Sequence, residues 1–372
     1  MKIVIDGRMY SESGIGRYIR NLIGGLQKLD KNNQYFILHV LGDYNTLVYH
    51  NNFNKVLADF KWYGISEQIR LPKLLSSLKP DLVHFPHFNL PLFYKSKFVV
   101  TIHDLIHQHF RMDRVTRLNP LVYRLKQLGY NKVFQNAITK SAKILVPSSY
   151  VKDLLTSDWH LDSKKIQVTE EAVDEKILTI AKVMSKEKCK KILTKFKIKP
   201  PYLFYVGNAH PHKNLEGLIN AFLKVKENRV NLTLVLSGGD HYFWQRLKRE
   251  NKYKDINFTG FVSDEELVAL YKSAELFVMP SYEEGFGIPL LEAMASSCAV
   301  VSSNAGSLRE VGGDACLYFD PGDKGDMVNK IDKVLNNESL RKEMIRKGQK
   351  RVEQFSWEKL AKQTLEVYRK CI

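Results

Sequence analysis

The chain has 372 residues, of which 44% are hydrophobic and 26% charged. This length exceeds one ordinary compact domain and suits two, each with its own core. The 19 Phe, 18 Tyr and 4 Trp exclude a mainly disordered chain, and only 21 Gly and 4 Cys exclude collagen-like and disulfide-framework proteins. The widely spaced cysteines form no CxxC pair, so we expect free thiols in a reducing compartment.

The formal net charge of +17 is unevenly distributed. Residues 1–195 hold 31 Lys and Arg against 17 Asp and Glu, whereas residues 196–372 hold 26 against 23. The basic excess therefore belongs to the N-terminal half. Such a surface could attract phosphates, anionic lipids or nucleic acid. An ordinary lysine-rich, solvated surface is the alternative.

No segment has the pattern of a signal peptide or a membrane span. The sequence opens directly with the apolar strand MKIVID, and the longest apolar runs are strand-sized. We expect a soluble, cytoplasmic protein that at most lies on the inner surface of a membrane.

Short β-branched runs alternate with longer amphipathic segments along the whole chain, which predicts parallel sheets covered on both faces. A lysine-rich connector, residues 175–201, is expected to contain one short helix and to separate two Rossmann-like α/β halves. The predicted strands are 3–6, 35–40, 82–85, 98–102, 144–147, 202–206, 232–237, 256–258, 276–279 and 299–302, and the predicted helices of the first half are 16–29, 66–78 and 122–141.

The most informative segment follows the predicted strand 276–279. A glycine-containing loop leads into a helix that should begin near Ile288 or Pro289, where the amides of residues 285–287 suit an anion such as a diphosphate. Glu284 precedes this helix and Glu292 lies in its second turn, so the two carboxylates could bracket an extended ligand. A helix cap for Glu284 and a surface charge for Glu292 are the alternatives.

A second candidate element follows the strand 202–206. Gly207 ends that strand, and Lys213 stands just before a helix, where a cation could reach a diphosphate. A surface lysine beside a capping Asn is the alternative. Further along, Ser263 and Glu266 have the spacing of a capping box at the start of another helix.

Two elements of the first half are weaker signals. Gly14, Gly16 and Arg17 open a helix in a loop that could approach a phosphate or an acceptor. Ile19 stands where a dinucleotide fingerprint needs Gly or Ala, which counts against a dehydrogenase. His103 closes a predicted strand, and a lone histidine there is usually a packed or capping residue.

The segment EGFGIPLLEAM, with two glutamates separated by seven residues, resembles the signature of the family 4 retaining glycosyltransferases, which have the GT-B fold. The similarity continues through 302–315 and 319–323 and covers essentially the whole chain. It implies two Rossmann-like domains with parallel sheets facing across a cleft, and a last helix that crosses back to the N-terminal domain. The domains expected are 1–180 with 356–372 for the acceptor, and 196–355 for the donor.

The resemblance also implies roles for particular residues. Lys213 is expected at the donor diphosphate, and Glu292 at the ribose. His103 and Glu284 are expected at the transferred sugar, with Asp104 as an orienting partner of His103 or an acceptor contact. The expected catalytic residues are thus His103, Glu284 and Lys213, and the expected donor-binding residues are Gly14, Gly16, Arg17, Gly207, Asn208, Lys213, Phe261, Val262, Glu284, Gly285, Phe286, Gly287, Ile288 and Glu292.

The sequence departs from the family pattern at Asn208, where many members have an arginine directly after the glycine. His210, His212 or Arg17 could supply the missing cationic contact. The backbone of Phe261 and Val262 is expected to face the nucleobase, which leaves the identity of the base open. The histidines near His103 match no metal-ligand spacing, and GT-B enzymes generally need no metal, so we expect none.

The expected activity is transfer of a hexose from a nucleoside-diphosphate sugar to a glycan or a polyprenyl-diphosphate-linked acceptor. The segments TIHDL and VGNAHPHKN most resemble bacterial mannosyltransferases of polysaccharide and lipopolysaccharide assembly. GDP-mannose is therefore the first donor expected, with UDP- and ADP-sugars as alternatives. A sugar-nucleotide epimerase and a glycan phosphorylase remain alternative functions. A nucleic-acid-binding protein is a remote one, because no helix-turn-helix, zinc-finger or RNP-like pattern is found.

A basic amphipathic stretch follows the strand that ends near His103. Such a surface could rest on anionic lipid and present the active site to a lipid-linked acceptor. An ordinary helix with a solvated basic face is the alternative. The stretch includes the basic residues Arg111, Arg114, Arg117, Arg124 and Lys126 and the apolar residues Leu118, Leu121, Val122 and Leu125.

Overall fold

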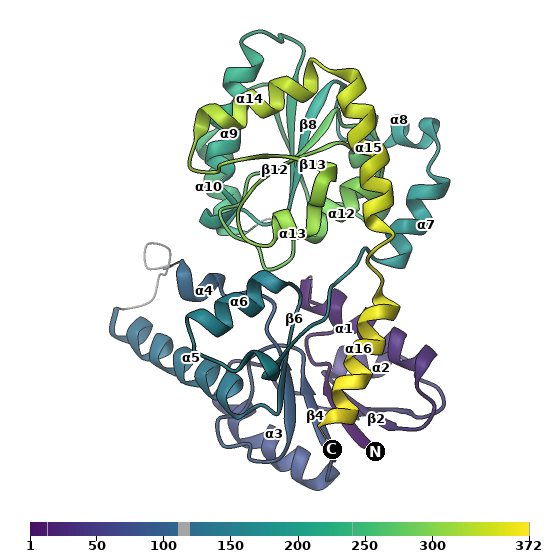
Figure 1. Ribbon diagram of the computed structural model, residues 1–372, viewed down its shortest axis with the longest axis vertical. Helices are drawn as coiled ribbons and strands as arrows, with labels where there is room; N and C mark the ends of the chain where they lie inside the picture. The colour runs from purple at the N-terminus through teal and green to yellow at the C-terminus, as the bar shows by residue number, and fades with distance from the viewer. Residues whose placement is uncertain (13, 111–119, 240, 372) are drawn as a thin grey trace. The chain divides into compact units, whose positions relative to one another are not determined.

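The computed structural model describes residues 1–12, 14–110, 120–239 and 241–371, and of residues 120–126 the backbone alone. The chain forms two compact units: unit 1 consists of Met1–Glu171 with Trp357–Ile372, and unit 2 consists of Ala172–Ser356. In Figure 1, unit 1 begins in purple and ends with the yellow C-terminal helix.

Unit 1 contains a parallel sheet whose seven described strands have the order β3-β2-β1-β4-β5-β6-β7. The strands are β1 (Lys2–Asp6), β2 (Gln34–His39), β3 (Phe53–Leu57), β4 (Leu82–Phe85), β5 (Phe98–Thr101), β6 (Lys143–Val146) and β7 (Ile166–Val168). The helices are α1 (Gly14–Leu29), α2 (Leu41–Thr46), α3 (Ile65–Leu78), α4 (Ile106–His109), α5 (Pro120–Lys140), α6 (Ser149–Ser157) and α16 (Trp357–Lys370), with a 3-10 turn η1 (Ser163–Lys165).

The central strands of unit 1 are short apolar runs because helices cover both faces of the sheet. Every residue of β4 and β5 is buried. Helix α1 contributes an apolar stripe at helical spacing to this core, whereas its other face is polar. The buried side chains of the stripe are Tyr18, Ile19, Leu22, Ile23 and Leu26.

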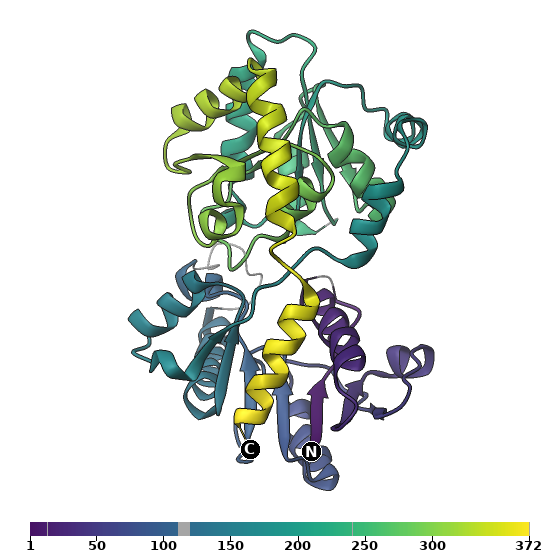
Figure 2. The ribbon, with the colours of Figure 1, turned by 45° about the vertical axis from the view of Figure 1, so that its right-hand side comes forward.

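The C-terminal helix α16 belongs to unit 1, which confirms the expectation that the last helix returns to the N-terminal domain. It packs against α1, and the two lie side by side in Figures 1 and 2. The approach is close: a Cβ atom added at Gly25 would lie 2.6 Å from the Cβ of Ala361. The hydroxyl of Tyr368 also lies 2.6 Å from Nδ1 of His84 on β4.

Unit 2 repeats the design with a parallel sheet whose six described strands have the order β10-β9-β8-β11-β12-β13. The strands are β8 (Tyr202–Val206), β9 (Thr233–Ser237), β10 (Ile256–Gly260), β11 (Leu276–Met279), β12 (Val300–Ser303) and β13 (Cys316–Phe319). The helices are α7 (Glu175–Val183), α8 (Lys186–Lys195), α9 (Leu215–Lys226), α10 (Tyr242–Glu250), α11 (Asp264–Ser273), α12 (Ile288–Ala295), α13 (Leu308–Gly312), α14 (Lys324–Leu335) and α15 (Glu338–Val352), with 3-10 turns η2 (Pro211–Lys213) and η3 (Gly313–Ala315).

The segment expected to be a connector with one short helix forms two helices, α7 and α8, that pack against α11 of unit 2. The ammonium group of Lys272 on α11 donates to the carbonyl of Ala181 at 2.7 Å, and Lys188 pairs with Glu265 at 2.7 Å. The chain accordingly divides after Glu171 and not near residue 180, and unit 2 begins before residue 196. Both helices bury apolar side chains, such as Ile177 and Leu193. The many lysines between these residues made the apolar pattern difficult to recognise in the sequence.

In each sheet the strand order reverses between two neighbours. In unit 1 the reversal lies between β1 and β4, and in unit 2 between β8 and β11. Open α/β sheets bind ligands beyond the carboxyl ends of their strands at such a reversal. The loops after these four strands are therefore the first places to search for a site. Within the described residues, none of the helices has both the length and the apolar content needed to cross a bilayer.

Candidate active site

An ion pair joins two loops of unit 2, one after β8 and one after β11. Nζ of Lys213 lies 2.6 Å from Oε1 of Glu284 and 2.7 Å from Oε2. The two side chains are 12% and 8% exposed. Because β8 and β11 flank the reversal of strand order, the pair lies where sheets of this type bind ligands.

Hydrogen bonds fix the loop that carries Glu284. The hydroxyl of Ser281 donates to Oε1 of Glu284 at 2.6 Å, and that of Ser307 donates to the carbonyl oxygens of Glu284 and Phe286 at 3.0 and 2.9 Å. Gly306 has a φ of +60°, and a Cβ atom there would lie 2.7 Å from both the backbone nitrogen and the backbone oxygen of Glu284. The carboxylate is therefore held in place by its own unit.

Helix α12 begins at Ile288, as the sequence predicted. Gly287 precedes it in the left-handed region with a φ of +95°, and Gly285 and Phe286 are buried beside it. The helix thus directs its positive end toward the segment that carries Glu284. Glu292, in the second turn, is 3% exposed, and its Oε2 lies 3.4 Å from the hydroxyl of Tyr271. A contact of Glu292 with ribose stays a prediction.

The loop after β8 is shaped by Tyr205 and Asn208. The hydroxyl of Tyr205 donates to the carbonyl of Asn208 at 2.8 Å, just beyond Gly207, and Oδ1 of Asn208 accepts from the amide of His210 at 3.2 Å. Burial, with the charge of Glu284, raises the pKa of Tyr205 well above its ordinary value, so this hydroxyl stays protonated. Asn208 therefore stabilises the turn, and the rings of His210 and His212 stack 5.8 Å apart beside it.

The segment expected to face the nucleobase leads from β10 into α11. Phe261 is 83% exposed, and Val262 is half-buried. The capping box predicted for α11 is confirmed, since Ser263 Oγ accepts from the amide of Glu266 and Glu266 Oε2 accepts from the amide of Ser263. The base contact itself stays a prediction.

In unit 1, His103 follows β5 and is hydrogen-bonded through both ring nitrogens. Nδ1 lies 3.0 Å from Oε1 of Glu171, and Nε2 lies 2.9 Å from the carbonyl oxygen of Pro86. Burial alone would lower the pKa of His103, but the bond and charge of Glu171, the Pro86 carbonyl and the charge of Asp104 together raise it. The carbonyl of Pro86 can only accept, so Nε2 donates to it, and the imidazolium form can in addition donate from Nδ1 to Glu171.

The expected orienting partner of His103 needs correction. Oδ1 of Asp104 accepts from the amide of Ile106 at 3.1 Å, two residues along the chain, whereas Glu171 is the carboxylate hydrogen-bonded to the imidazole ring. Sequence reasoning missed Glu171, which follows β7. The available signal was a carboxylate pair, Glu170 and Glu171, directly after a short β-branched run.

The residues expected at the start of α1 have different environments. A Cβ atom at Gly16 would lie 2.4 Å from the carbonyl oxygen of Tyr10, whereas nothing lies within 4 Å of one at Gly14. Gly16 is thus required for close packing of the chain on itself, and Gly14 is exposed. Arg17 is half-buried in the first turn of the helix.

The structure brings Lys213 and Glu284 into contact and places His103 with Glu171 in the other unit. No group of three His, Cys, Asp or Glu suited to a metal ion is found among the described residues. Of the basic stretch, Arg111, Arg114, Arg117 and Leu118 lie outside the described residues, as do the side chains of Leu121, Val122, Arg124, Leu125 and Lys126.

Two family models match the chain. "Glycosyltransferase Family 4" matches residues 13–176, and "Glycosyl transferases group 1" matches residues 185–351. O-antigen chain mannosyltransferase B of Escherichia coli is 31% identical over 305 residues, which cover 79% of this chain and 76% of that protein. This chain belongs to the family 4 glycosyltransferases. Membership favours a glycosyltransferase over the epimerase, phosphorylase and nucleic-acid-binding alternatives.

Further comparisons place this glycosyltransferase among proteins of the same fold. O-antigen chain mannosyltransferase RfbU of Salmonella typhimurium is 28% identical over 273 residues, covering 72% of this chain and 69% of the relative. WaaG, a glycosyltransferase involved in lipopolysaccharide biosynthesis, superposes with a TM-score of 0.73 at 14% identity over 99% of both chains. Anabaena HepE, solved with UDP-glucose, superposes with a TM-score of 0.77 at 15% sequence identity over 100% of both chains. These likenesses establish the GT-B fold.

Proposed function

We propose that this glycosyltransferase transfers a hexose, with retention of anomeric configuration, from a nucleoside-diphosphate sugar to a glycan or a polyprenyl-diphosphate-linked acceptor. The observation that carries the proposal is the contact of Lys213 with Glu284 at the strand-order reversal of unit 2. A cation and a carboxylate on adjoining loops suit a donor in which a diphosphate is attached to a polyhydroxyl sugar.

In the proposed reaction, Lys213 and the positive end of α12 stabilise the charge that develops on the departing diphosphate. The bond between the anomeric carbon and the diphosphate oxygen breaks, and the acceptor oxygen bonds to the same face of that carbon. The acceptor hydroxyl gives its proton to the departing phosphate. No metal ion is required in this scheme.

Glu284 acts in this scheme as a hydrogen-bond acceptor for sugar hydroxyls. Its two oxygens already accept from Lys213, and one also accepts from Ser281. The cation and the hydroxyl stabilise the charge of the carboxylate and so make it a weaker nucleophile, while its remaining lone pair can still accept from a sugar hydroxyl. A covalent glycosyl–Glu284 intermediate is therefore the less favoured route.

His103 contributes a positive charge in the scheme. As an imidazolium held by Glu171 and Pro86, it favours departure of an anionic diphosphate brought beside it. The ring would bond the transferred sugar by exchanging the Pro86 carbonyl for a sugar oxygen.

GDP-mannose is the proposed donor. The support is the function of two relatives, both O-antigen chain mannosyltransferases. UDP-sugars are the second candidate class, since HepE was solved with UDP-glucose, and ADP-sugars are the third. By the same relatives, the proposed acceptor is a growing bacterial polysaccharide. The proposed location is the cytoplasmic side of the membrane, where the basic N-terminal half would meet anionic lipid.

A thermal-shift screen with GDP-mannose, UDP-glucose and ADP-glucose tests the donor. A donor at 100 times its dissociation constant should stabilise the protein by about 2.7 kcal/mol. Glu284→Gln and His103→Ala should then lose kcat while their affinity for the bare nucleotide stays near that of the wild type. Stabilisation by none of the three sugar nucleotides would contradict the proposal.

Attachment to a membrane is the last part of the proposed function, and its support is the basic excess of the N-terminal half. Sedimentation with anionic vesicles, falling as salt rises, is the expected result, with neutral vesicles as the control. Replacing Arg124 and Lys126 with glutamine should reduce it. Absence of sedimentation at low salt would favour a soluble acceptor.

A further inference from the structure

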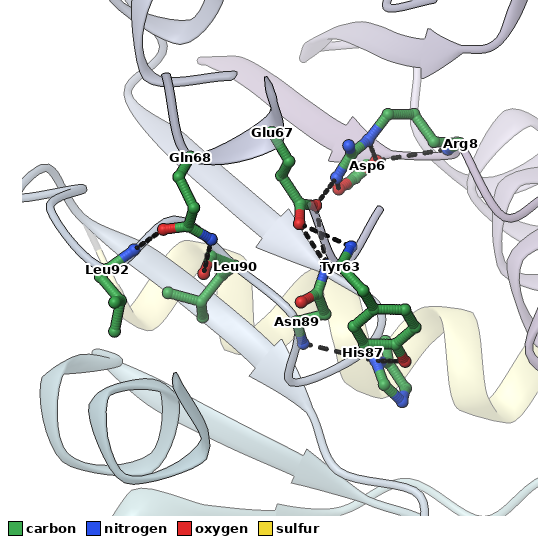
Figure 3. Close-up of polar contacts among 9 residues, drawn as sticks. All are labelled: Asp6, Arg8, Tyr63, Glu67, Gln68, His87, Asn89, Leu90 and Leu92. Carbon is green, nitrogen blue, oxygen red and sulfur yellow. Dashed lines mark hydrogen bonds and ion pairs between the residues drawn. The ribbon is translucent and has the colours of Figure 1, made fainter. Parts of the chain in front are cut away.

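A cluster of buried charged side chains lies at the carboxyl end of β1 in unit 1. Arg8 forms a two-point ion pair with Asp6, with Nε 2.8 Å from Oδ1 and Nη2 2.6 Å from Oδ2. Nη2 also lies 2.5 Å from Oε1 of Glu67 on α3, and Nδ2 of Asn89 lies 2.8 Å from both oxygens of Glu67. Figure 3 shows Glu67 enclosed by Arg8, Asn89 and Tyr63.

The hydrogen bonds indicate that both carboxyl groups of the cluster are ionised. Each oxygen of Asp6 accepts from Arg8. Oε1 of Glu67 accepts from Arg8, and Oε2 accepts from the amide of Tyr63 at 3.0 Å. A protonated carboxyl group would have to donate from one of these oxygens. Two carboxylates and one guanidinium therefore leave a net charge of −1 in a buried position.

One nitrogen of the Arg8 guanidinium, with its two N–H groups, is left over. Nη1 is buried, and the side chain as a whole is 2% exposed. This nitrogen has no hydrogen-bond partner among the described residues. Buried donors in native structures are nearly always satisfied, so an unpaired guanidinium N–H points to a partner that binds there.

Arg8 lines a small cavity that supplies the space for such a partner. The cavity lies at the carboxyl ends of β1 and β4, the strands that flank the reversal of strand order in unit 1. It has room for about one water-sized group. Its polar lining is Asp6, Arg8, His87 and Asn89, and the rest is Met9, Ile15, Ile19, Trp62, Phe85 and Pro86.

The segment after β4 that forms one wall is held rigidly. The amide of Asn89 donates to Nδ1 of His87 at 3.3 Å, and Gln68 of α3 bonds the backbone of Leu90 and Leu92 at 3.4 and 2.8 Å (Figure 3). The cavity is therefore preformed.

We propose that this cavity is the subsite that receives one hydroxyl group of a neutral acceptor sugar. Nη1 of Arg8 donates to the sugar oxygen, and Asp6 accepts the hydroxyl hydrogen. A hydroxyl both donates and accepts, which matches the spare guanidinium N–H and the remaining lone pair on Oδ2 of Asp6. Trp62, half-buried in the lining, offers an aromatic face to the C–H side of the ring. This inference rests on the proposed function and specifies the class of acceptor.

The charge of the cluster selects against acidic sugars and phosphates. An anion would meet the net charge of −1 where little water screens it. His87 does not offset this charge, because burial together with the charges of His103 and His107 lowers its pKa to about 3. A neutral sugar forms the same hydrogen bonds without that repulsion.

Binding of simple glycosides to the full chain tests the proposal without turnover. The indole N–H signal of Trp62, assigned with Trp62→Phe, is followed by NMR. The neutral probes are the methyl glycosides of mannose, glucose, galactose and N-acetylglucosamine, together with monodeoxy analogues of the one that binds best. The charged probes are methyl glucuronide and inorganic phosphate. We expect saturable shifts with a neutral glycoside, a loss of tenfold or more in affinity for one monodeoxy analogue, and weaker binding of both anions.

Three variants identify the contact. Arg8→Lys keeps the charge beside Asp6 and Glu67 but removes Nη1, and it should abolish the discrimination against that monodeoxy analogue. Trp62→Ala leaves the ion pairs intact. It should weaken binding of the parent glycoside and of the monodeoxy analogue equally, as measured by calorimetry. Arg70→Lys is the matched control, because Arg70 packs on the same Phe60 ring as Arg8 but does not line the cavity.

Three results would overturn the proposal: tighter binding of phosphate or glucuronide than of any neutral glycoside, no saturable shift with any probe, or unchanged discrimination in a folded Arg8→Lys variant. If Arg8→Lys does not fold, an unchanged glycoside affinity in Trp62→Ala would overturn the proposal instead. Nucleotide binding, measured separately by thermal shift, reports on the proposed function. If no sugar nucleotide binds but glycosides bind as expected, the proposed function is contradicted and the proposal of the sugar subsite is not.

Discussion

The ammonium group of Lys213 lies within 2.7 Å of both carboxylate oxygens of Glu284, so each side chain neutralises the other in a nearly buried position. Removing one member of such a pair leaves an uncompensated buried charge, which typically costs ~3–5 kcal/mol of stability. A test of function at this pair must therefore separate loss of folding from loss of binding.

Lys213→Ala should weaken nucleoside-diphosphate binding by roughly tenfold or more, since charge-assisted hydrogen bonds contribute ~1.5–3 kcal/mol. The double variant Lys213→Ala with Glu284→Gln should regain stability, because no carboxylate is left unpaired, but should not regain nucleotide affinity. Calorimetry and chemical denaturation measure the two properties. Lys224→Ala, which breaks an exposed pair with Glu227, is the control. If the double variant binds the nucleotide as tightly as the wild type, Lys213 does not contact the donor.

The elements around this pair could be predicted from the sequence because they are local. Strands β8 and β11 are continuous apolar runs, and Pro289 after two glycines marks the start of α12. The contact between Lys213 and Glu284 follows from the topology, since both loops leave strands that turned out to be neighbours. Pattern alone placed each residue at the end of a strand, and only the strand order placed the two together.

The strands that the sequence did not reveal are edge strands. β3 and β7 end the sheet of unit 1, and β13 ends that of unit 2. An edge strand is covered less completely, so its residues need not form a continuous apolar run; β3 reads FNKVL and β7 is only three residues long. The omission of β7 concealed Glu171, which follows it. The contact of Arg8 with Glu67 could not be predicted from the sequence either, because the two residues are 59 positions apart.

Gly306→Ala should impair the active site from outside it. The new methyl group would lie 2.7 Å from the backbone of Glu284, and the φ of +60° adds strain of order 1 kcal/mol for a residue with a Cβ atom. We expect a fall in kcat through displacement of the Glu284 carboxylate. Gly313→Ala is the control, with a similar φ of +56°, because the atoms nearest to its added Cβ belong to the Arg351 side chain and lie 3.3 Å or more away. Equal turnover in the two variants would refute this role of Gly306.

Neighbouring glycines on α1 provide a test of how α16 packs on unit 1. Gly25→Ala would bring its methyl group to 2.6 Å from that of Ala361, and overpacking of this kind typically costs ~1–3 kcal/mol of unfolding free energy. Gly24→Ala meets nothing within 4 Å and should instead stabilise the helix by about 0.5–1 kcal/mol. Urea denaturation of both variants measures the difference. A Gly25→Ala protein as stable as Gly24→Ala would mean that α16 does not pack closely there.

Glu171→Gln should change the protonation of His103. The carboxylate is the main group that raises the pKa of this histidine against the effect of burial, so in the variant burial should dominate and the pKa should fall. A group whose pKa is higher in the folded than in the unfolded protein stabilises the fold below the unfolded value of about 6.5, and this stabilisation is lost as pH rises through the folded value. The wild type should therefore exceed Glu171→Gln in stability most near pH 6, and the gap should narrow toward alkaline pH.

An NMR titration of the His103 ring, with denaturation at several pH values between about 6 and 9, measures both effects. Glu170→Gln is the control, because the neighbouring Glu170 pairs with exposed Lys359 at 2.6 Å and has no bond to His103 among the described contacts. Loss of the imidazolium should also reduce kcat of Glu171→Gln relative to the wild type, most strongly between the lowered His103 pKa of the variant and the raised pKa of the wild type, where only the wild-type ring is protonated. An unchanged His103 pKa in Glu171→Gln would mean that the Pro86 carbonyl and Asp104 suffice to hold the proton.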